Sequence, residues 1–269
     1  LAAIFTGVWG YGALLLLITV IGVWEFYGLA RAKGSEPQRC MGMLISVVLF
    51  LAGFVPSLHI YGEIDNRELL GNGLNILMLF AMLLVITFVI EVFRNRQTPI
   101  YNIATTIMGT LYVALPMGIL LFVPSKMNAF ICRGDGWTPW VFLFYLLLVW
   151  GNDVFAYLVG VTMGKHRMCE RLSPKKSWEG FVGGIAGSVA VGAIGALVLG
   201  GSYGVWIGLA VVVALSSVVG DLIESMFKRD AKVKDSGSIM PGHGGILDRL
   251  DSMLFAIPAV VVYLLAISL

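Results

Sequence analysis

Long apolar runs alternate with short polar stretches along almost the whole chain. Each run consists mainly of Leu, Ile, Val, Met, Phe and Ala, and a helix that spans a bilayer needs roughly 20 such residues. The pattern predicts an all-α fold, a polytopic membrane helix bundle with short loops and helical extensions. Eight spanning helices are expected, at residues 9–30, 41–61, 70–93, 101–123, 137–163, 181–200, 203–219 and 252–269.

The first seven residues form an apolar stretch that is too short to span a bilayer and contains no initiator Met. We expect this stretch to be the end of an additional helix. The full-length protein is then expected to have nine spanning helices.

The overall composition excludes a soluble globular domain. Hydrophobic residues make up 58% of the chain, charged residues only 13%, and the mean hydropathy is +0.90. Gly180, Gly183, Gly184 and Gly187 form overlapping small-xxx-small patterns, which allow helix backbones to approach closely. No tandem repeat or long linker divides the sequence, so we expect one integrated membrane domain.

The distribution of basic residues predicts the orientation of the helices, because Lys and Arg are retained on the cytoplasmic side. Of the 18 Lys and Arg residues, fifteen lie in alternate connections and three in the others. Every second connection is therefore expected in the cytoplasm and the C-terminus outside. The connections that carry the excess are residues 31–40, 94–100, 164–180 and 220–251.

Acids and amides inside apolar helices are costly in lipid and often mark functional sites. Glu25 lies near a predicted helix end, where a carboxylate usually reaches the interface, so we interpret the N-terminal half as scaffold. Asn152 and Asp153, in contrast, lie well inside a predicted helix. Function is therefore expected in the C-terminal half.

One face of the helix at residues 137–163 combines a carboxylate, a phenol and two glycines. Asp153, Tyr157, Gly160 and Gly164 recur at i, i+4, i+7 and i+11. We expect this face to point into the bundle and to line a polar cavity.

A charged stretch follows the apolar helix at residues 203–219 and is expected to continue it. Asp221, Glu224, Ser225 and Lys228 fall at i, i+3, i+4 and i+7, which places them on one helix face. Such a face suits half of a metal and phosphate site. A solvated helix end with local ion pairs is the alternative.

Residues 234–245 are too rich in Gly, Pro and Ser for a helix or a regular strand. Glycines at 242, 244 and 245 allow close approach of a ligand, and their N–H groups suit a phosphate near the start of the next helix, around Ile246. His243 stands between glycines and is a weaker candidate, since a lone histidine is usually structural.

Asp248 and Asp251 open the last apolar helix at i and i+3 and can reach one cation. Helix capping is the alternative explanation, because acids in a first turn suit the helix dipole. From residue 220 to 252, however, there are six acids and five Lys or Arg, more than two helix ends require. Together they suit Mg²⁺ and a polyphosphate.

A second basic segment, residues 173–180, contains the adjacent lysines Lys175 and Lys176. The two lysines could bind phosphates. Their alternative roles are to set the topology or to bind anionic lipid headgroups.

Residues 225–251 resemble the phosphatidate cytidylyltransferase family. Thirteen positions match the family pattern in spacing, and Met240 stands where the family usually has Leu, Ile or Phe. Asp153 with Tyr157 and the segment 173–180 also resemble the family, so the resemblance covers at least the last 120 residues. The matching positions are Ser225, Lys228, Arg229, Lys234, Asp235, Gly237, Pro241, His243, Gly244, Gly245, Asp248, Arg249 and Asp251.

The resemblance implies an enzyme that makes CDP-diacylglycerol and pyrophosphate from CTP and phosphatidate, with Mg²⁺ as cofactor and room for a second cation. It implies residues 125–269 as the catalytic region, residues 1–124 as scaffold, and a multi-pass protein of the cell inner (plasma) membrane with its active site facing the cytoplasm. A homodimer is an expectation of the resemblance, and no nucleic-acid partner is expected.

The resemblance also assigns roles to individual residues. The metal ligands are expected to be Asp221, Asp248 and Asp251. The catalytic set is Lys228, Lys234, Asp235, His243, Arg249 and Asp251. The substrate-binding set is Asp153, Ser173, Lys175, Lys176, Ser177, Ser225, Gly244 and Gly245.

Two other functions stay open at this point. A CTP-dependent enzyme that acts on another lipid, such as a polyprenol kinase or an ether-lipid cytidylyltransferase, could share the nucleotide and metal residues. An ion transporter would use Asp153 and the cytoplasmic carboxylates as an ion path, but it would spread carboxylates along several helices.

Overall fold

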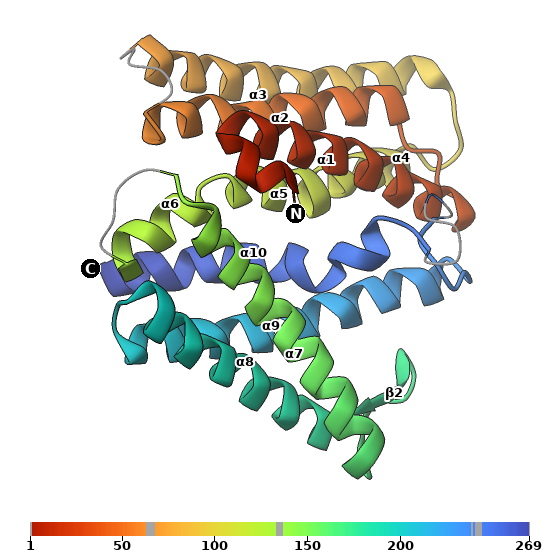
Figure 1. Ribbon diagram of the computed structural model, residues 1–269. Helices are drawn as coiled ribbons and strands as arrows, with labels where there is room; N and C mark the ends of the chain where they lie inside the picture. The colour runs from red at the N-terminus through yellow and green to blue at the C-terminus, as the bar shows by residue number, and fades with distance from the viewer. Residues whose placement is uncertain (1, 63–67, 133–136, 238, 240–243, 269) are drawn as a thin grey trace. The chain divides into compact units, whose positions relative to one another are not determined.

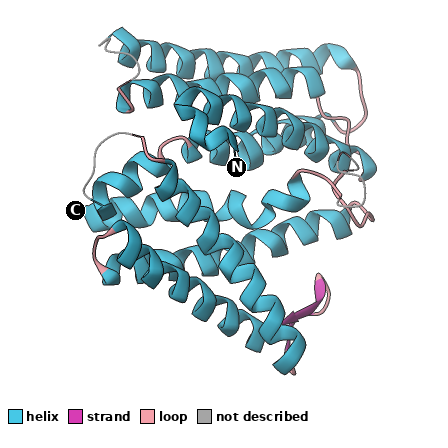
Figure 2. Ribbon diagram, in the orientation of Figure 1, coloured by secondary structure: helices cyan, strands magenta, loops and turns pink. Residues whose placement is uncertain are grey.

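The computed structural model describes residues 2–62, 68–132, 137–237, 239 and 244–268, and these are almost entirely helical (Figure 2). Among them, eight helices are long and apolar enough to cross a membrane. This confirms the predicted all-α, polytopic membrane bundle. The eight candidate spans are Ile4–Ala32, Arg39–Ile60, Leu74–Arg94, Pro99–Leu120, Pro139–Met163, Trp178–Leu199, Tyr203–Asp230 and Leu247–Ser268.

The elements follow one another along the chain with short connections (Figure 1). The N-terminal elements are the 3-10 helix η1 (Ala2–Thr6), α1 (Gly7–Ala32), α2 (Arg39–Ile60), α3 (Glu68–Arg94), α4 (Pro99–Gly109), the π-helical turn η2 (Thr110–Ala114) and α5 (Leu115–Leu120). The later elements are α6 (Val123–Met127), η3 (Asn128–Cys132), α7 (Pro139–Met163), β1 (Arg167–Cys169), β2 (Ser173–Ser177), α8 (Trp178–Leu199), α9 (Tyr203–Asp230) and α10 (Leu247–Ser268).

The chain divides into two compact units. Unit 1 comprises Leu1–Phe122 and Phe227–Leu250, and unit 2 comprises Val123–Met226 and Asp251–Leu269. Helices α9 and α10 each contribute residues to both units. The predicted functional division at residue 124 stays a prediction.

In unit 1, α1 and α3 both pack against α2 (Figure 1). The end of α9 belongs to this unit because Phe227 packs edge-on against Phe26 of α1 and Tyr112 of η2, with ring centroids 5.8 and 5.2 Å apart. Lys33, just after α1, adds a hydrogen bond of 2.5 Å to Asp230, which raises the pKa of the Lys33 ammonium.

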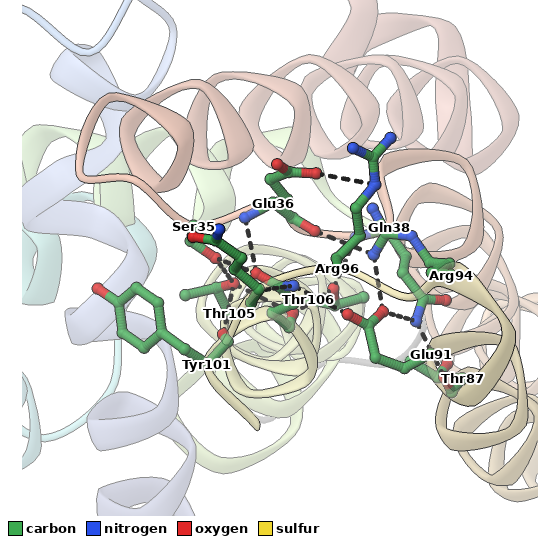
Figure 3. A network of polar contacts seen from close by, with 12 residues as sticks. Ser35, Glu36, Gln38, Thr87, Glu91, Arg94, Arg96, Tyr101, Thr105 and Thr106 are labelled. Carbon is green, nitrogen blue, oxygen red and sulfur yellow. Dashed lines mark hydrogen bonds and ion pairs between the residues drawn. The ribbon is translucent and has the colours of Figure 1, made fainter. Parts of the chain in front are cut away.

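A polar network in unit 1 fixes the ends of α3 and α4 to the connection before α2 (Figure 3). Its centre is the buried carboxylate of Glu91, which accepts hydrogen bonds from Gln38 Nε2 at 2.7 Å, Arg94 Nη1 at 2.7 Å and Asn102 Nδ2 at 2.9 Å. No motif or spacing in the sequence predicts this cluster. Buried charges require such partners, and here three different elements supply them.

In unit 2, α7 packs along α8 through small residues, as the glycine spacing predicted. A Cβ on Gly180 would stand 2.7 Å from the Ala156 carbonyl oxygen, and one on Gly184 would stand 2.6 Å from Asn152 Oδ1. The predicted inward face of α7 is confirmed at Gly160, which meets Gly180 of α8, but it is wrong at Tyr157. Tyr157 is 69% exposed, because the neighbouring face of α7, with Asn152 and Ala156, takes the contact with α8.

The basic segment between α7 and α8 is an antiparallel hairpin of β1 and β2 rather than a plain loop (Figure 2). Glu179, in the first turn of α8, holds the chain before β1. Its carboxylate accepts the Lys165 and His166 N–H groups at 3.1 and 3.2 Å and lies 2.6 Å from His166 Nδ1. Glu179 thus joins the start of α8 to the residues directly before the hairpin.

Candidate functional site

The candidate residues form two sets within the described part of the chain, one in each unit. Each set has an Asp paired with a Lys: Asp221 with Lys176 in unit 2, and Asp248 with Lys228 in unit 1. The lysines are among those predicted to contact phosphates, and the aspartates are predicted metal ligands.

In unit 2, the hairpin presents Lys176 to the last turns of α9. Its Nζ lies 2.6 Å from Asp221 Oδ2, while Asp221 Oδ1 accepts a hydrogen bond of 3.3 Å from Ser225 Oγ. The Ser225 contact confirms that positions i and i+4 of the predicted helical face are neighbours. Asp153 of α7 interacts electrostatically with both Asp221 and Lys176, and accepts a hydrogen bond of 3.2 Å from Asn152 Nδ2.

The direction of Lys176 follows from how its strand ends. Ser177, the next residue, is buried and extended, and its Oγ accepts the Gly180 N–H at 3.1 Å as the N-cap of α8. Side chains alternate along a strand, so Lys175 points away from Lys176 and is exposed. The structure therefore separates two lysines that the sequence treated alike.

In unit 1, Asp248 is the most highly bonded of the predicted carboxylates. Lys228 Nζ lies 2.7 Å from Asp248 Oδ1, and Oδ2 accepts the Ser236 N–H and Oγ–H at 2.9 Å each and the Gly245 N–H at 2.8 Å. The Asp248 and Lys228 side chains are only 10% and 15% exposed. One carboxylate thus connects Lys228 at the end of α9 and the start of α10 with Ser236 and Gly245, two residues of the glycine-rich segment (residues 234–245).

The bond from Gly245 to Asp248 realises the capping alternative, since a carboxylate in the first turn of α10 accepts an N–H three residues earlier. Gly244 precedes it with a φ of +82°, a conformation that favours glycine. The capping N–H of Gly245 binds Asp248 Oδ2, whereas Oδ1 faces the Lys228 ammonium. Capping and a phosphate or metal role would therefore use different oxygens of the same carboxylate.

Glu25 is the residue whose interpretation the structure changes. Its side chain is buried: Glu25 is 4% exposed and accepts the Ile246 and Leu247 N–H groups at 3.0 and 2.9 Å. Helix α1 continues to Ala32, so Glu25 lies nearly two turns from its end. In the sequence, where the predicted helix ends at residue 30, the position of Glu25 carries no signal of these contacts.

The remaining predicted residues are placed as follows. Lys234, Asp235 and Arg249 are exposed, whereas Ser173 and Asp251 are partly buried, and their roles stay predictions. His243 lies outside the described residues. Asp251 Oδ1 accepts the Ser252 N–H at 2.6 Å.

The donor chemistry fits Mg²⁺. Carboxylate oxygens are hard ligands, and Mg²⁺ usually takes one or two of them together with substrate phosphates. Among residues 2–62, 68–132, 137–237, 239 and 244–268, no three His, Cys, Asp or Glu side chains gather as a metal cage. Asp221 and Asp248 could therefore each supply a carboxylate ligand, with the paired lysine turning to a phosphate.

Replacing Lys176 with Gln is expected to lower kcat/KM for nucleotide transfer roughly ten- to hundredfold, the equivalent of one charge-assisted hydrogen bond of about 1.5–3 kcal/mol. Steady-state kinetics with each substrate varied would show which KM rises. Lys175→Gln is the matched comparison, with the same charge change one residue away, and a smaller loss is expected. Equal losses would mean that the side-chain directions in the hairpin do not matter.

Comparisons with known proteins show which family the chain resembles over most of its length. A phosphatidate cytidylyltransferase of Synechocystis sp. is 32% identical over 280 residues, which cover 94% of this chain and 88% of that protein. Phosphatidate cytidylyltransferases of Staphylococcus saprophyticus and Staphylococcus epidermidis are 36% and 38% identical over 198 and 182 residues, covering 73% and 67% of this chain and 72% and 65% of theirs. The model of the cytidylyltransferase family matches residues 1–267. This chain therefore belongs to the cytidylyltransferase family.

Proposed function

We propose that this membrane protein transfers the cytidylyl group of CTP to phosphatidate and so forms CDP-diacylglycerol and pyrophosphate. The observation that carries the proposal is the likeness, over most of the chain, to relatives named phosphatidate cytidylyltransferase. The two Lys–Asp pairs support it, because both substrates are anions that bear phosphate.

In the proposed reaction, an ionised phosphate oxygen of phosphatidate attacks the α-phosphorus of CTP. A new P–O bond forms there, and the bond from the α-phosphorus to the oxygen bridging to the β-phosphorus breaks. The electron pair leaves with pyrophosphate. No general base is required, so the residues of the chain chiefly position two anions and neutralise charge.

Lys176 and Lys228 are the cations best placed for this work. Each now neutralises one aspartate at 2.6 or 2.7 Å, and each has a flexible stem with three donors. When substrates bind, the ammonium groups are proposed to turn from the carboxylates to phosphate oxygens. Lys234, Arg249 and Lys175 would add positive charge.

The cofactor proposed is Mg²⁺, with Asp221, Asp248 and Asp251 as the candidate ligands that the resemblance implies and with a second cation as a further possibility of the resemblance. When bound, Mg²⁺ supplies charge neutralisation on the triphosphate. In that state, Mg²⁺ would replace Lys176 and Lys228 as the positive partner of Asp221 and Asp248.

The active site is proposed to face the cytoplasm of the inner membrane. Fifteen of the 18 Lys and Arg lie in alternate connections, and these include the hairpin and the segment between α9 and α10. CTP would then bind without crossing the bilayer, while phosphatidate would enter from it. A homodimer stays a prediction.

The experiment compares lipid acceptors. Purified protein is incubated with CTP, with and without Mg²⁺, and with phosphatidate, a polyprenol or an ether-linked acceptor, and the lipid products are identified by mass spectrometry. CDP-diacylglycerol is expected from phosphatidate and CTP only in the reactions that contain Mg²⁺. Product from another acceptor, with phosphatidate unchanged, would favour a related lipid enzyme, and ion flux in liposomes without CTP would favour a transporter.

A further inference from the structure

We infer that Glu25 of α1 is a positioning residue for Asp248: its buried carboxylate holds Ser236 and the start of α10, and thereby orients Asp248. The inference rests on the proposed function for its catalytic consequence. All the residues involved belong to unit 1.

The first support is the pattern of hydrogen bonds. Glu25 Oε1 accepts the Ile246 N–H at 3.0 Å, and Oε2 accepts the Leu247 N–H at 2.9 Å. The first N–H groups of a helix have no partner within it, and a carboxylate there also suits the helix dipole. A residue more than 200 positions away thus caps α10 immediately before Asp248.

The second support is Ser236, which connects Glu25 to Asp248. Its Oγ lies 3.4 Å from Glu25 Oε2 and 2.9 Å from Asp248 Oδ2. Ser236 is 7% exposed, so solvent does not replace these contacts. Ser236 is therefore shared by the two carboxylates, while Glu25 also accepts two amides at the start of α10 and Asp248 also accepts the Gly245 N–H.

The third support is how closely the backbone approaches Glu25. A Cβ built on Gly237 or Gly245 would collide with the Glu25 carboxylate, and on Gly245 also with Ser236 Oγ. Glycine is thus needed at both positions, because each backbone lies against the same acid of α1. Glu25 consequently fixes how closely Gly237 and Gly245 can approach α1.

The test uses Glu25→Gln, which is nearly isosteric but replaces one accepting oxygen with a donating NH₂. One of the two helix N–H groups then faces a donor. Amide hydrogen exchange of peptides covering 236–250, measured in detergent without substrates, is expected to speed up. The kcat per folded protein is expected to fall about 10- to 100-fold, as for residues that orient a catalytic ligand, and the melting temperature is expected to fall because a buried N–H loses its acceptor.

Glu91→Gln is the matched control, because Glu91 is an equally buried carboxylate of unit 1 that binds Gln38, Arg94 and Asn102 (Figure 3). It is expected to lower the melting temperature and to leave both the exchange of 236–250 and the kcat per folded protein unchanged. Glu25→Asp keeps both accepting oxygens on a shorter stem, so it should restore part of the kcat and of the protection, and it serves as the second variant if Glu25→Gln yields no folded protein.

Unchanged exchange of 236–250 in Glu25→Gln, or in Glu25→Asp where only that variant folds, would overturn the inference. So would a normal kcat, or a loss of kcat in Glu91→Gln equal to that in Glu25→Gln. These outcomes are distinct from failure of the proposed function, in which the wild-type protein leaves phosphatidate unchanged whatever the exchange shows.

Discussion

Replacing Asp221 with Asn is expected to lower kcat/KM for cytidylyl transfer about 100- to 1000-fold, the scale of losing one preorganised electrostatic contact to the reacting phosphates. The change removes the negative charge that is proposed to hold Mg²⁺, and Lys176 loses its partner at 2.6 Å. The Asp221 side chain is 32% exposed, so the protein should still fold. Initial rates at increasing Mg²⁺ should show a higher Mg²⁺ requirement.

Asp230→Asn is the matched control for Asp221. Asp230 ends the same helix, is 56% exposed and pairs with Lys33, outside every predicted site position. An exposed pair contributes little to stability because water screens it, so activity and melting temperature should stay close to wild type. If Asp221→Asn keeps near-normal activity at low Mg²⁺, Asp221 is not a metal ligand.

Asp248→Asn is expected to lose at least as much activity, about 100- to 1000-fold, and also to loosen the segment before α10. Asp248 Oδ1 faces Lys228, and Oδ2 accepts three donors from Ser236 and Gly245. An amide keeps one oxygen and places its NH₂ against either the ammonium or the N–H donors. Activity and hydrogen exchange of 236–250 should therefore change together.

Lys228→Met separates the two effects at Asp248. It removes the ammonium but leaves the three donors to Oδ2 in place, so activity should fall while the exchange of 236–250 stays near wild type. Some loss of stability is expected, because Asp248 is only 10% exposed and keeps its charge without a cation. Full activity in Asp248→Asn, or unchanged exchange in that variant, would contradict this account.

The spanning helices could be predicted from the sequence because lipid imposes a long apolar run on each of them. Helical spacing also predicted that α9 continues beyond its apolar part, and it ends at Asp230. The glycine-rich residues before position 246 predicted the start of α10, which begins at Leu247. Local patterns were sufficient for these elements, and for the contact of Ser225 with Asp221.

The contacts that local patterns could not predict join residues far apart in the chain. Glu25 meets Ile246 and Leu247 across more than 200 residues, and a carboxylate near a predicted helix end gives no sign of such a partner. Tyr157 shared its expected face with Gly160, but helix periodicity does not say which of two adjacent faces packs against α8. The sequence does not distinguish Lys175 from Lys176, whereas in the structure they point to opposite sides of a strand and only Lys176 pairs with Asp221.

The bond broken in CTP is the most direct test of the proposed chemistry. Purified protein is given phosphatidate, Mg²⁺ and CTP labelled in parallel reactions at the α- or the γ-phosphorus, and the label in the lipid is measured. Cytidylyl transfer predicts that the α-label enters the lipid and the γ-label appears in pyrophosphate. A lipid that carries the γ-label, with CDP as the second product, would contradict the account and indicate a lipid kinase.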